Sequence, residues 1–469
     1  MSAERLPPLR RVTHALAVPV RRFLEWKWLR AGLATDAWNA ERLRAYHDTM
    51  LRRVVQSAAR HIPFYQQLYR QADVDVAGFR GVADLPKLPM IQKTDLLEHA
   101  QRLRRPGVPG WLTGSVNTGG SSGQVATIWF YAGTSGREMG SIACLWQRVG
   151  ARWSDRMAVL RGLVPSRSGA NWEYDRAARR LILSSYRITA DGVREFIALM
   201  KQYRIQWLHA YPTSALLMAN VMASAGIGLE APLRGVLLAS ESVFAGQPEY
   251  CEQVFGCPVY AHYGHREIVL LAGWCPGSRE YHFLPNYGFV EFVPTGTAPP
   301  GCDQMYELVG TRYMDQYMPL IRYRTNDFAA PSEPGPCHAC GRWHVRAKTI
   351  YGRGQELLVG RGGVVIPVVN INASFAYRHA RRFQFKQDEP GKVDYLFVPV
   401  NLAQVESAVT ELEANFASLE QWGLRARVVP VAELPATPNA KDRIVARSIP
   451  LPWEPQLMET KVALRGCVT

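Results

Sequence analysis

Short apolar runs that alternate with helical patterns constrain the fold of this chain more than any other feature. Four such runs, each beside a segment whose apolar residues have helical spacing, lie at 157–160, 207–211, 235–239 and 258–263. Buried strands separated by helices favour α/β layers around a largely parallel sheet. Because ligands bind at the carboxyl ends of the strands in such sheets, Ser240, Glu241 and the run 263–267 are candidates for a site.

The length of 469 residues and a change of pattern along the chain indicate more than one domain. The sequence becomes strand-rich from about Val290, and a smaller α+β pattern follows Gly354. The expected fold class is α/β, with a large N-terminal domain of mixed or parallel sheets packed by helices and a smaller α+β C-terminal domain. The expected segments are a basic helical extension (1–45), the large domain (46–353) with a strand-rich subdomain (270–350), and the small domain (354–469).

Composition and hydropathy predict a cytoplasmic protein. No run of about 18 apolar residues is present, so a membrane-spanning helix is not expected. The apolar run 15–20 ends at Arg21 and Arg22, which makes it too short for a secretory signal. Eight cysteines, two of them in a Cys-x-x-Cys pair, suit a reducing compartment better than a disulfide scaffold.

The formal charge of +15 favours anionic partners such as nucleotides and coenzymes. Arginines crowd the first fifty residues between the aromatic residues Phe23, Trp26, Trp28 and Trp38. A solvated helical face explains this pattern, and docking on a membrane surface or a polyanion site are the alternatives. We expect no nucleic-acid partner, and peripheral membrane contact through the basic N-terminus stays open.

A loop of glycines and hydroxyl residues at 117–127 precedes the strand-like run 128–131. Glycine lets backbone N–H groups approach an anion closely, and hydroxyl groups add neutral donors. The loop lacks the Lys-Ser/Thr ending of a Walker loop, which excludes a P-loop NTPase. The alternatives are a phosphate cradle and an ordinary surface turn. The candidate cradle consists of Thr118, Gly119, Gly120, Ser121, Ser122 and Gly123.

The order of the motifs along the chain is more specific than any one of them. The loop is followed by Ser240-Glu241, then by Tyr263-Gly-His-Arg-Glu267, Tyr323-Arg-Thr-Asn-Asp327, Gly352-Arg353 and Lys441. This order resembles the adenylate-forming ligases, and more closely the branch of the phenylacetate-CoA ligases and the capsular polysaccharide biosynthesis proteins. The resemblance covers nearly the whole chain from about residue 45 and includes the runs 62–65, 89–96 and 383–387.

The resemblance implies two-step chemistry and a mobile C-terminal domain. A carboxylate attacks the α-phosphorus of ATP and forms an acyl-adenylate and pyrophosphate. A thiol, with CoA as the expected acceptor, or another nucleophile then takes the acyl group. Such chemistry needs donors around the phosphates, a magnesium ligand, ribose anchors and a cation at the reacting centre.

The resemblance also implies a role for each motif. The loop 118–123 would cradle the phosphates, Glu267 would hold Mg²⁺, and Lys441 would bridge the carboxylate and the α-phosphate. The nucleotide would further meet Ser240, Glu241, Gly264, Tyr263 (stacking on adenine), Asp327 (ribose hydroxyls) and Arg353 (ribose or phosphates). The alternatives are a surface ion pair between Asp327 and Arg353, a helix start at Glu267 and a solvated Lys441.

Three departures from the pattern of the relatives stand out. Arg266 occupies the position before the magnesium glutamate, where relatives carry a small hydroxyl residue. We expect the Arg266 side chain either to pair with a phosphate of the nucleotide or to obstruct the phosphate site. The hinge position is Gln355, which makes no charged contact, and the loop reads Gly-Gly-Ser-Ser-Gly-Gln.

Three cysteines and one histidine have the spacing of a structural zinc site. Cys275 and His282 are followed by the pair Cys337 and Cys340. Thiolates and imidazole suit tetrahedral Zn²⁺, and some members of the resembled branch carry a comparable site. The alternatives are free buried cysteines, His338 or His344 as substitute ligands, and Cys302 as a further ligand. Cys144, Cys251 and Cys257 are expected in the core.

His209 and Tyr211 follow a strand-like run at a position where relatives shape the acyl pocket. His265 would orient the carboxylate, and an aromatic pocket would suit an apolar or aryl acid. Plain core packing is the alternative. Further candidates for the wall are Trp129, Tyr131, Trp146 and Ser240.

Three functions follow from these motifs. The first is an acid–CoA ligase that uses ATP, Mg²⁺ and a small carboxylic acid, with structural zinc. The second is an adenylate-forming amide or ester ligase with an amine or sugar acceptor, in polysaccharide or natural-product biosynthesis. The third is a non-catalytic scaffold derived from the same fold. The sequence names neither the acid nor the acceptor, and it does not fix the oligomeric state.

Overall fold

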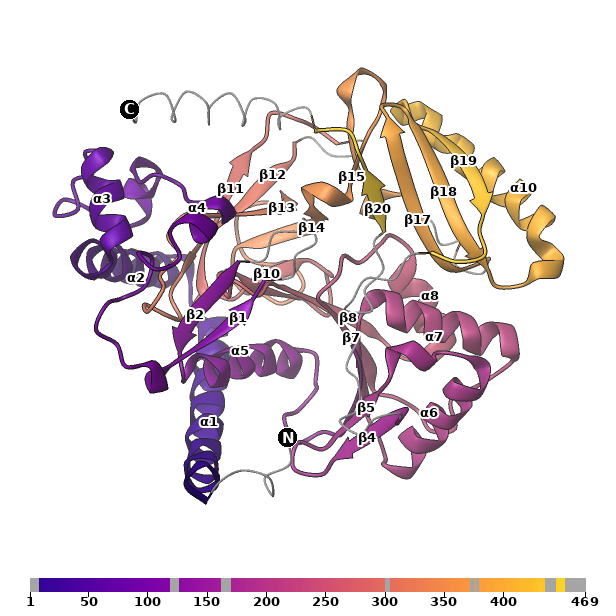
Figure 1. Ribbon diagram of the computed structural model, residues 1–469, viewed down its shortest axis with the longest axis horizontal. Coiled ribbons are helices and arrows are strands. Elements are labelled where there is room, and N and C mark those ends of the chain that lie inside the picture. The colour runs from indigo at the N-terminus through magenta and orange to yellow at the C-terminus, as the bar shows by residue number, and fades with distance from the viewer. Residues whose placement is uncertain are drawn as a thin grey trace.

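The computed structural model describes residues 8–118, 126–161, 170–299, 304–371, 376, 379–434 and 444–451. A large unit ends with the strand β14, and a small unit follows it (Figure 1). Most of the candidate phosphate loop (119–125), Lys441 and Cys302 lie outside the described residues, as does the side chain of Gln355.

Capping and helix-breaking residues set the ends of the helices in the N-terminal part. Asn39 caps α2 by accepting a hydrogen bond from the N–H of Arg42 at 2.9 Å. Pro63 starts α3 and leaves Ile62 extended between the two helices. The helices of this part are α1 (Pro8–Ala34), α2 (Ala40–His61), α3 (Pro63–Gln71) and α4 (Lys93–Glu98).

Helix α1 packs closely against α5 (Thr134–Arg148). Gly140 of α5 makes this possible, since a Cβ atom there would lie 2.3 Å from the backbone oxygen of Glu25. Asp36, just after α1, forms ion pairs with Arg148 of α5 and with Arg342. The basic extension is therefore docked on the large unit.

A 12-stranded mixed sheet forms the centre of the large unit. Its order is β11-β12-β13-β14-β10-β9-β8-β7-β6-β3-β5-β4. The helices α6 (Ala190–Gln202), α7 (Pro212–Ala225) and α8 (Gln247–Phe255) pack against one face, and α5 lies against the other. The strands are β3 (Met157–Leu160), β4 (Trp172–Asp175), β5 (Arg180–Leu183), β6 (Trp207–Ala210), β7 (Gly235–Ala239), β8 (Val259–Gly264), β9 (Leu271–Trp274), β10 (Tyr281–Phe283), β11 (Gly288–Pro294), β12 (Tyr306–Arg312), β13 (Tyr323–Pro331) and β14 (Arg346–Arg353).

The prediction of a largely parallel sheet is correct only for one part of it. The strands β5, β3, β6, β7 and β8 pair in parallel, and from β9 to β14 every pairing is antiparallel. Parallel pairs need long crossovers, which the helices supply, whereas short connections such as the one between β8 and β9 favour antiparallel pairing. The strand-rich residues after 270 therefore extend the same sheet.

The small unit contains a two-stranded sheet and a four-stranded sheet of order β19-β18-β17-β20. Its hydrophobic core includes Leu216, Phe244 and Phe328 of the large unit, so the two units share packed side chains. The strands and helix are β15 (Leu357–Val359), β16 (Val365–Pro367), β17 (Ala380–Glu389), β18 (Lys392–Pro399), α10 (Val405–Phe416), β19 (Arg425–Pro430) and β20 (Val445–Arg447).

Among the described residues, every helix is too short or too polar to cross a bilayer. Cys144, Cys251 and Cys257 are buried in the core, as predicted.

Candidate active site

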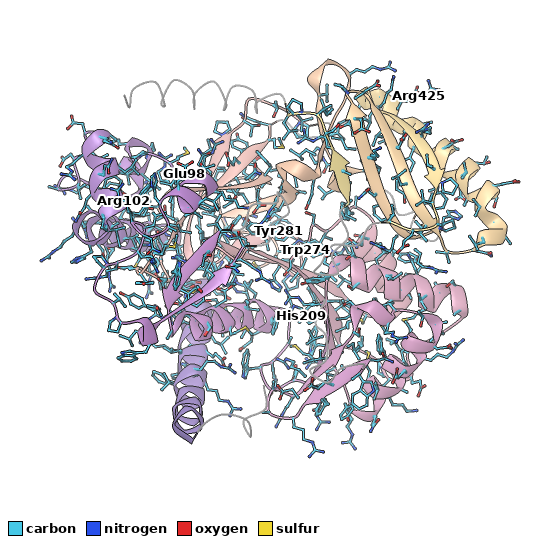
Figure 2. The ribbon with its side chains drawn as sticks, in the orientation of Figure 1. Glu98, Arg102, His209, Trp274, Tyr281 and Arg425 are labelled. Atoms are coloured by element: carbon cyan, nitrogen blue, oxygen red, sulfur yellow. The ribbon has the colours of Figure 1, made fainter. Side chains whose placement is uncertain are left out.

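Four parallel strands bring polar residues to one edge of the sheet. Arg161, Tyr211, Ser240 and His265 each follow the last residue of β3, β6, β7 and β8, respectively. Since the registers of these strands align their carboxyl ends, the four residues share one edge. His209, near the end of β6, lies in the middle of the molecule, away from Arg425 on the small unit (Figure 2). The edge is where the sequence placed its candidate site.

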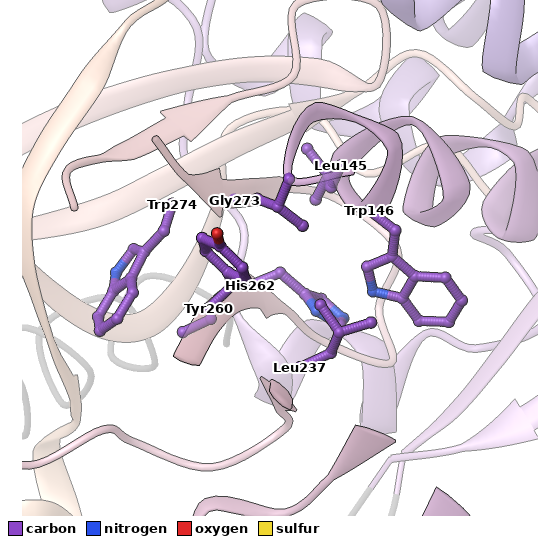
Figure 3. Close-up of a pocket in the computed structure, with 9 residues that line it drawn as sticks. Leu145, Trp146, Leu237, Tyr260, His262, Gly273 and Trp274 are labelled. Carbon is purple, nitrogen blue, oxygen red and sulfur yellow. The ribbon is translucent and has the colours of Figure 1, made fainter. Parts of the chain in front are cut away.

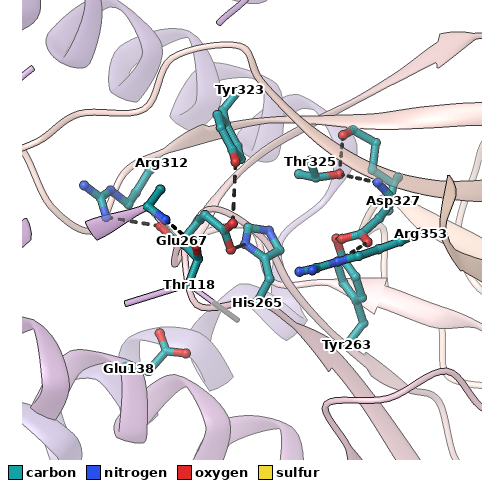
Figure 4. Close-up of polar contacts among 12 residues, drawn as sticks. Thr118, Glu138, Tyr263, His265, Glu267, Arg312, Tyr323, Thr325, Asp327 and Arg353 are labelled. Atoms are coloured by element: carbon teal, nitrogen blue, oxygen red, sulfur yellow. Dashed lines mark hydrogen bonds and ion pairs between the residues drawn. The ribbon is translucent and has the colours of Figure 1, made fainter. Parts of the chain in front are cut away.

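Glu267 lies in a turn after β8 and is 6% exposed. Its Oε2 lies 3.3 Å from Nδ1 of His265, and the hydroxyl of Tyr323 donates to Oε1 at 3.5 Å (Figure 4). Burial opposes ionisation, but the hydrogen bond and charge of His265 and the charge of Arg353 outweigh it and lower the pKa of Glu267 to about 2. Glu267 is an ionised carboxylate outside any helix, which excludes the helix-start alternative.

Asp327 and Arg353 form a partly buried ion pair on adjacent strands. They lie opposite each other in the register of β13 and β14, and Arg353 Nε lies 3.5 Å from Asp327 Oδ1. The hydroxyl of Tyr263 donates to Asp327 Oδ2 at 2.6 Å (Figure 4). Asp327 is 5% exposed and the Arg353 side chain is 32% exposed, so the ion pair considered from the sequence is present but lies only partly at the surface. The residues Tyr263, His265, Glu267, Asp327 and Arg353 are called the strand-end cluster below.

The candidate phosphate loop begins beside the strand-end cluster. Strands β1 (Thr113–Asn117) and β2 (Thr127–Tyr131) form a hairpin that holds its ends together. Thr118 contributes two hydrogen bonds with Ala126, at 2.8 and 3.0 Å. Arg266 Nη1 donates to the backbone oxygen of Asn117 at 3.3 Å. The unusual Arg266 therefore contacts the base of the loop; the roles of Gly119, Gly120, Ser121, Ser122 and Gly123 stay predictions.

Ser240 and Glu241 differ from each other in what they contact. Ser240 adopts a left-handed backbone with φ of +71°, and its hydroxyl accepts a hydrogen bond from Arg161. Glu241 accepts from the N–H and the hydroxyl of Thr213, at 3.1 and 2.7 Å, at the start of α7. Glu241 thus satisfies free donors of a helix N-terminus. Gly264 ends β8, where a Cβ would lie 3.0 Å from Leu271.

His209 and Tyr211 meet around Arg161, and His265 does not join them. Arg161 Nη1 donates to His209 Nε2 at 3.1 Å, and its guanidinium lies 5.4 Å from the centre of the Tyr211 ring. Burial and the charge of Arg161 lower the pKa of His209 well below its usual value. His265 instead faces Glu267. The predicted substrate residues therefore fall into two groups.

The four candidate zinc ligands lie together. The donor atoms of Cys275, His282, Cys337 and Cys340 are all within 4.8 Å of one another. Cys337 Sγ lies 3.9 Å from Cys275 Sγ, close to the roughly 3.8 Å that two thiolates on tetrahedral zinc would have. Both ring nitrogens of His282 are buried without a hydrogen-bond partner among the described residues.

The environment of these four residues suits a metal better than free thiols. Although burial alone would raise it, hydrogen bonds from Ser278 and from backbone N–H groups lower the pKa of Cys337 to about 7. His344, considered as a substitute ligand, is turned away: its Nε2 lies 3.2 Å from the Thr35 hydroxyl. The donor set of three sulfurs and one imidazole fits zinc.

Arg161 and His262 were not predicted as site residues from the sequence. Lys93 was noted only as part of the run 89–96. Arg161 follows the end of β3, and this position could have revealed it by the rule that revealed Ser240. Burial and the nearby charge of Arg353 lower the pKa of Lys93, which places this lysine beside the strand-end cluster. No local pattern marks His262.

Comparisons with known proteins agree with this architecture. No family model matches the chain. The phenylacetate-coenzyme A ligase of Thermus thermophilus is 27% identical over 346 residues, which cover 70% of this chain and 74% of that protein. Protein CapK of Staphylococcus aureus is 21% identical over 378 residues, covering 78% and 81%. A solved 2-hydroxyisobutyryl-CoA ligase matches with a TM-score of 0.67 at 16% identity, covering 92% of this chain and 94% of its own.

The chain therefore shares the fold of the solved 2-hydroxyisobutyryl-CoA ligase. Its sequence is similar to those of the phenylacetate-coenzyme A ligase and of CapK.

Proposed function

We propose that this protein activates a carboxylic acid with ATP and transfers the acyl group to CoA. The observation that carries the proposal is the strand-end cluster, which assembles an ionised carboxylate and a partly buried acid–arginine pair beside the hairpin of the glycine-rich loop. The likeness to phenylacetate-coenzyme A ligases supports the choice of acceptor.

The residues divide the work of the first step. A carboxylate oxygen bonds to the α-phosphorus of ATP while the bond to pyrophosphate breaks. Asp327 accepts hydrogen bonds from the ribose, Arg353 supplies positive charge next to it, and Lys441 approaches the reacting oxygens with its ammonium group. In the second step the thiolate sulfur of CoA bonds to the acyl carbon and AMP leaves.

Glu267 has the chemistry to hold Mg²⁺. Its carboxylate is ionised and buried, and hard cations prefer such oxygen ligands. When bound, the ion supplies charge neutralisation on the phosphate oxygens.

A second candidate is an adenylate-forming ligase whose acceptor is an amine or a sugar hydroxyl. The likeness to CapK, which is not named as a CoA ligase, favours it. The first step is the same, and only the atom that attacks the acyl carbon differs.

ATP–pyrophosphate exchange with a panel of carboxylic acids tests the proposal. We expect exchange with at least one acid and a loss of about a hundredfold or more in Lys441→Ala, since Lys441 would contact the charge that develops in the transition state. Thioester formation with CoA, compared with amide or ester formation on amines and sugars, then separates the two acceptors. Absence of exchange with every acid would support the non-catalytic scaffold instead.

We further propose that Cys275, His282, Cys337 and Cys340 hold a structural zinc ion. Four protein ligands leave no open position, so the ion would not react but would tie β10 and the turn before it to the connection between β13 and β14. Metal analysis of the purified protein should find about one zinc per chain and none in Cys337→Ser. Cys257→Ser, which changes a buried cysteine outside the cluster, is the control and should keep the metal. Metal-free wild-type protein would disprove this proposal.

The outer face of α1 supports contact with an anionic membrane surface. Val20, Phe23 and Trp26 are 60%, 58% and 53% exposed, and the guanidinium of Arg30 lies 5.4 Å from the Trp26 ring. Arg22 and Lys27 are exposed beside them. Aromatic residues and cations on one helix face are typical of helices that lie in the membrane interface. Residence in the cytoplasm, where such a surface is anionic, remains part of this proposal.

Vesicle sedimentation tests this contact. Binding to vesicles with phosphatidylserine should fall when Arg22, Lys27 and Arg30 are replaced by Gln, because each cation near the surface contributes about 1 kcal/mol. Arg361, Arg381 and Arg425, exposed on the small unit, provide a control with the same loss of charge. Equal losses in both triple variants would indicate attraction by net charge alone and would exclude a docking face.

A further inference from the structure

The turn that carries Glu267 contains an unusual backbone conformation. Ile268 adopts the left-handed region, with φ of +55°. This region is open mainly to glycine and asparagine, and for a β-branched residue it is an outlier that costs free energy. In the described part of the chain, Ile268 is the only β-branched residue with positive φ. The fold therefore holds this turn in a shape that the residue itself disfavours.

Three left-handed residues lie at the candidate active site. Ser240 follows β7, and Asn326 directly precedes Asp327. Ile268 directly follows Glu267. Residues held in sparsely populated conformations collect at functional sites, where the surrounding structure fixes them. Asparagine tolerates this region well, and Ser240 is itself a predicted site residue, so the strain at Ile268 needs an explanation of its own.

Hydrogen bonds hold the turn on both sides of Glu267. The N–H of Ile268 donates to the backbone oxygen of His265 at 3.0 Å, which closes a β-turn. The buried guanidinium of Arg312 donates to the backbone oxygen of Glu267 at 3.2 Å (Figure 4). The backbone of Glu267 is thus fixed before any ligand binds, with its carboxylate directed toward His265 and Tyr323.

The side chain of Ile268 anchors the turn in a hydrophobic core. It is 8% exposed and belongs to a core cluster that includes Leu145 of α5 and Leu284. The next two residues, Val269 and Leu270, belong to the main core cluster of the large unit instead. The left-handed residue lets consecutive apolar side chains enter two different cores. Burial of these side chains offsets the cost of the strained backbone.

Two glycines of neighbouring strands make room for this path of the chain. A Cβ on Gly288 of β11 would lie 2.2 Å from the backbone oxygen of Val269. A Cβ on Gly310 of β12 would lie 2.5 Å from Val269 Cγ1. A larger residue at either position would displace the segment that follows the turn. Packing from several elements therefore holds the turn in place, as a strained residue requires.

We propose that Ile268 is a positioning residue, whose buried side chain keeps the left-handed turn in place and so holds the Glu267 carboxylate where it can bind a magnesium ion. This proposal rests on the proposed function, because it concerns the residue that would hold Mg²⁺ in the ligase. A carboxylate that is already in place loses little conformational entropy when it binds the ion. Without the anchor, the turn relaxes to an ordinary conformation and the carboxylate moves.

Calorimetric titration of ATP, with Mg²⁺ present and with EDTA, tests this role without relying on catalysis. The ratio of the two dissociation constants measures the contribution of the ion. Ile268→Gly removes the anchor, yet glycine adopts positive φ freely, so the chain should still fold. We expect the ratio to fall toward one, by about threefold to tenfold, with the affinity in EDTA unchanged. Ile268→Val keeps a branched apolar anchor and should keep the wild-type ratio.

Leu284→Ala is the matched control. Leu284 is 1% exposed in the same core cluster, but it is not part of the turn. This variant should lower the melting temperature and keep the ratio. If Ile268→Gly does not fold, Ile268→Ala supplies the second variant. It also shortens the anchor, so it should lower the ratio in the same direction.

The outcomes separate this inference from the proposed function. A wild-type ratio in Ile268→Gly, with a lower melting temperature, would reduce Ile268 to core packing and overturn the inference. An equal fall of the ratio in Leu284→Ala would also overturn it, because general loosening would then explain both results. Wild-type protein that binds ATP equally well with and without Mg²⁺ would overturn it and leave the ligase intact. Absence of ATP binding under both conditions would remove the proposed function and the inference together.

Discussion

The strand-end cluster and the small cavity between α5 and the strands β7, β8 and β9 (Figure 3) differ in the charges they contain. In the cluster, Asp327 accepts a hydrogen bond from Tyr263 and pairs with Arg353, and Glu267 Oε2 lies 3.3 Å from His265 Nδ1. The cavity is lined mostly by apolar residues such as Leu145 and Leu237. A site whose charges are fixed before binding suits a charged ligand such as ATP. Changes in the cluster should therefore alter activity, and changes at the cavity should alter stability.

Removal of the Glu267 carboxylate should have the largest effect on activity. A small effect would contradict the role of the strand-end cluster in catalysis. Glu267→Gln keeps the shape of the side chain but removes the charge available to a magnesium ion. We expect exchange to fall by roughly 10²–10³-fold with every acid, measured at saturating Mg²⁺.

Glu138→Gln is the control for this loss. Glu138 is a nearby carboxyl group that accepts a hydrogen bond from Tyr287, and burial raises its pKa to about 7. It has no part in the proposed chemistry, so its variant should lose less than tenfold. Equal losses in both variants would mean that local packing, rather than the Glu267 charge, is being measured.

Asp327→Asn should have a smaller effect, confined to the nucleotide. The amide keeps the volume of the carboxylate but weakens the pair with Arg353 and the hydrogen bond from Tyr263. A lost charged hydrogen bond corresponds to about 1.5–3 kcal/mol, so KM for ATP should rise roughly 10–100-fold. Tyr263→Phe removes one of these contacts and should raise it less. An increase in KM for the acid instead would contradict the division between the two regions.

Gly273→Ala should change the opposite side of the comparison. The added methyl group would meet Leu145 at 3.1 Å, so this side chain would have to move. We expect the free energy of unfolding to fall by about 1–3 kcal/mol because the core is overpacked, with KM for ATP unchanged. Thermal unfolding together with steady-state kinetics for ATP measures this effect. A rise in KM for ATP would indicate a general distortion of the sheet.

Mild acid should reveal His262, a partly buried histidine of β8. The folded pKa of His262, about 3, lies below its usual value of about 6.5. As the pH falls below 6.5 the unfolded chain therefore takes up the proton first, and stability declines from there toward the folded pKa. At pH 5 the loss is about 1–2 kcal/mol. His262→Phe should show a smaller drop in melting temperature between pH 7 and pH 5, and an unchanged drop would disprove this source of acid sensitivity.

The sequence best predicted the features that depend on local apolar runs or on the order of motifs along the chain. The apolar runs before Arg161, Tyr211 and Ser240 predicted strands that the structure contains, and the motif order predicted the similarity to phenylacetate-coenzyme A ligases and CapK. Each of these depends on a local pattern of burial. The expected mixed sheet is present, but the sequence did not predict that the antiparallel strands after residue 270 join the parallel ones, because pairing depends on connections that no single run reveals.

Local sequence patterns could not predict contacts between residues that are far apart along the chain. Tyr263 and Asp327 are 64 positions apart, and only the fold makes them partners. The sequence left His282 and His344 as alternative ligands, and the structure separates them because His344 contacts Thr35, 309 positions away.

The register of β13 and β14 sets how this protein can vary in evolution. Asp327 and Arg353 meet because they are opposite residues in an antiparallel ladder. Successive side chains of a strand alternate between the two faces of the sheet, so one inserted residue within either strand would place the two on opposite faces. The connection 332–345 carries no such constraint on the pair, although it contains Cys337 and Cys340. Insertions and deletions between relatives should therefore collect in that connection and avoid both strands.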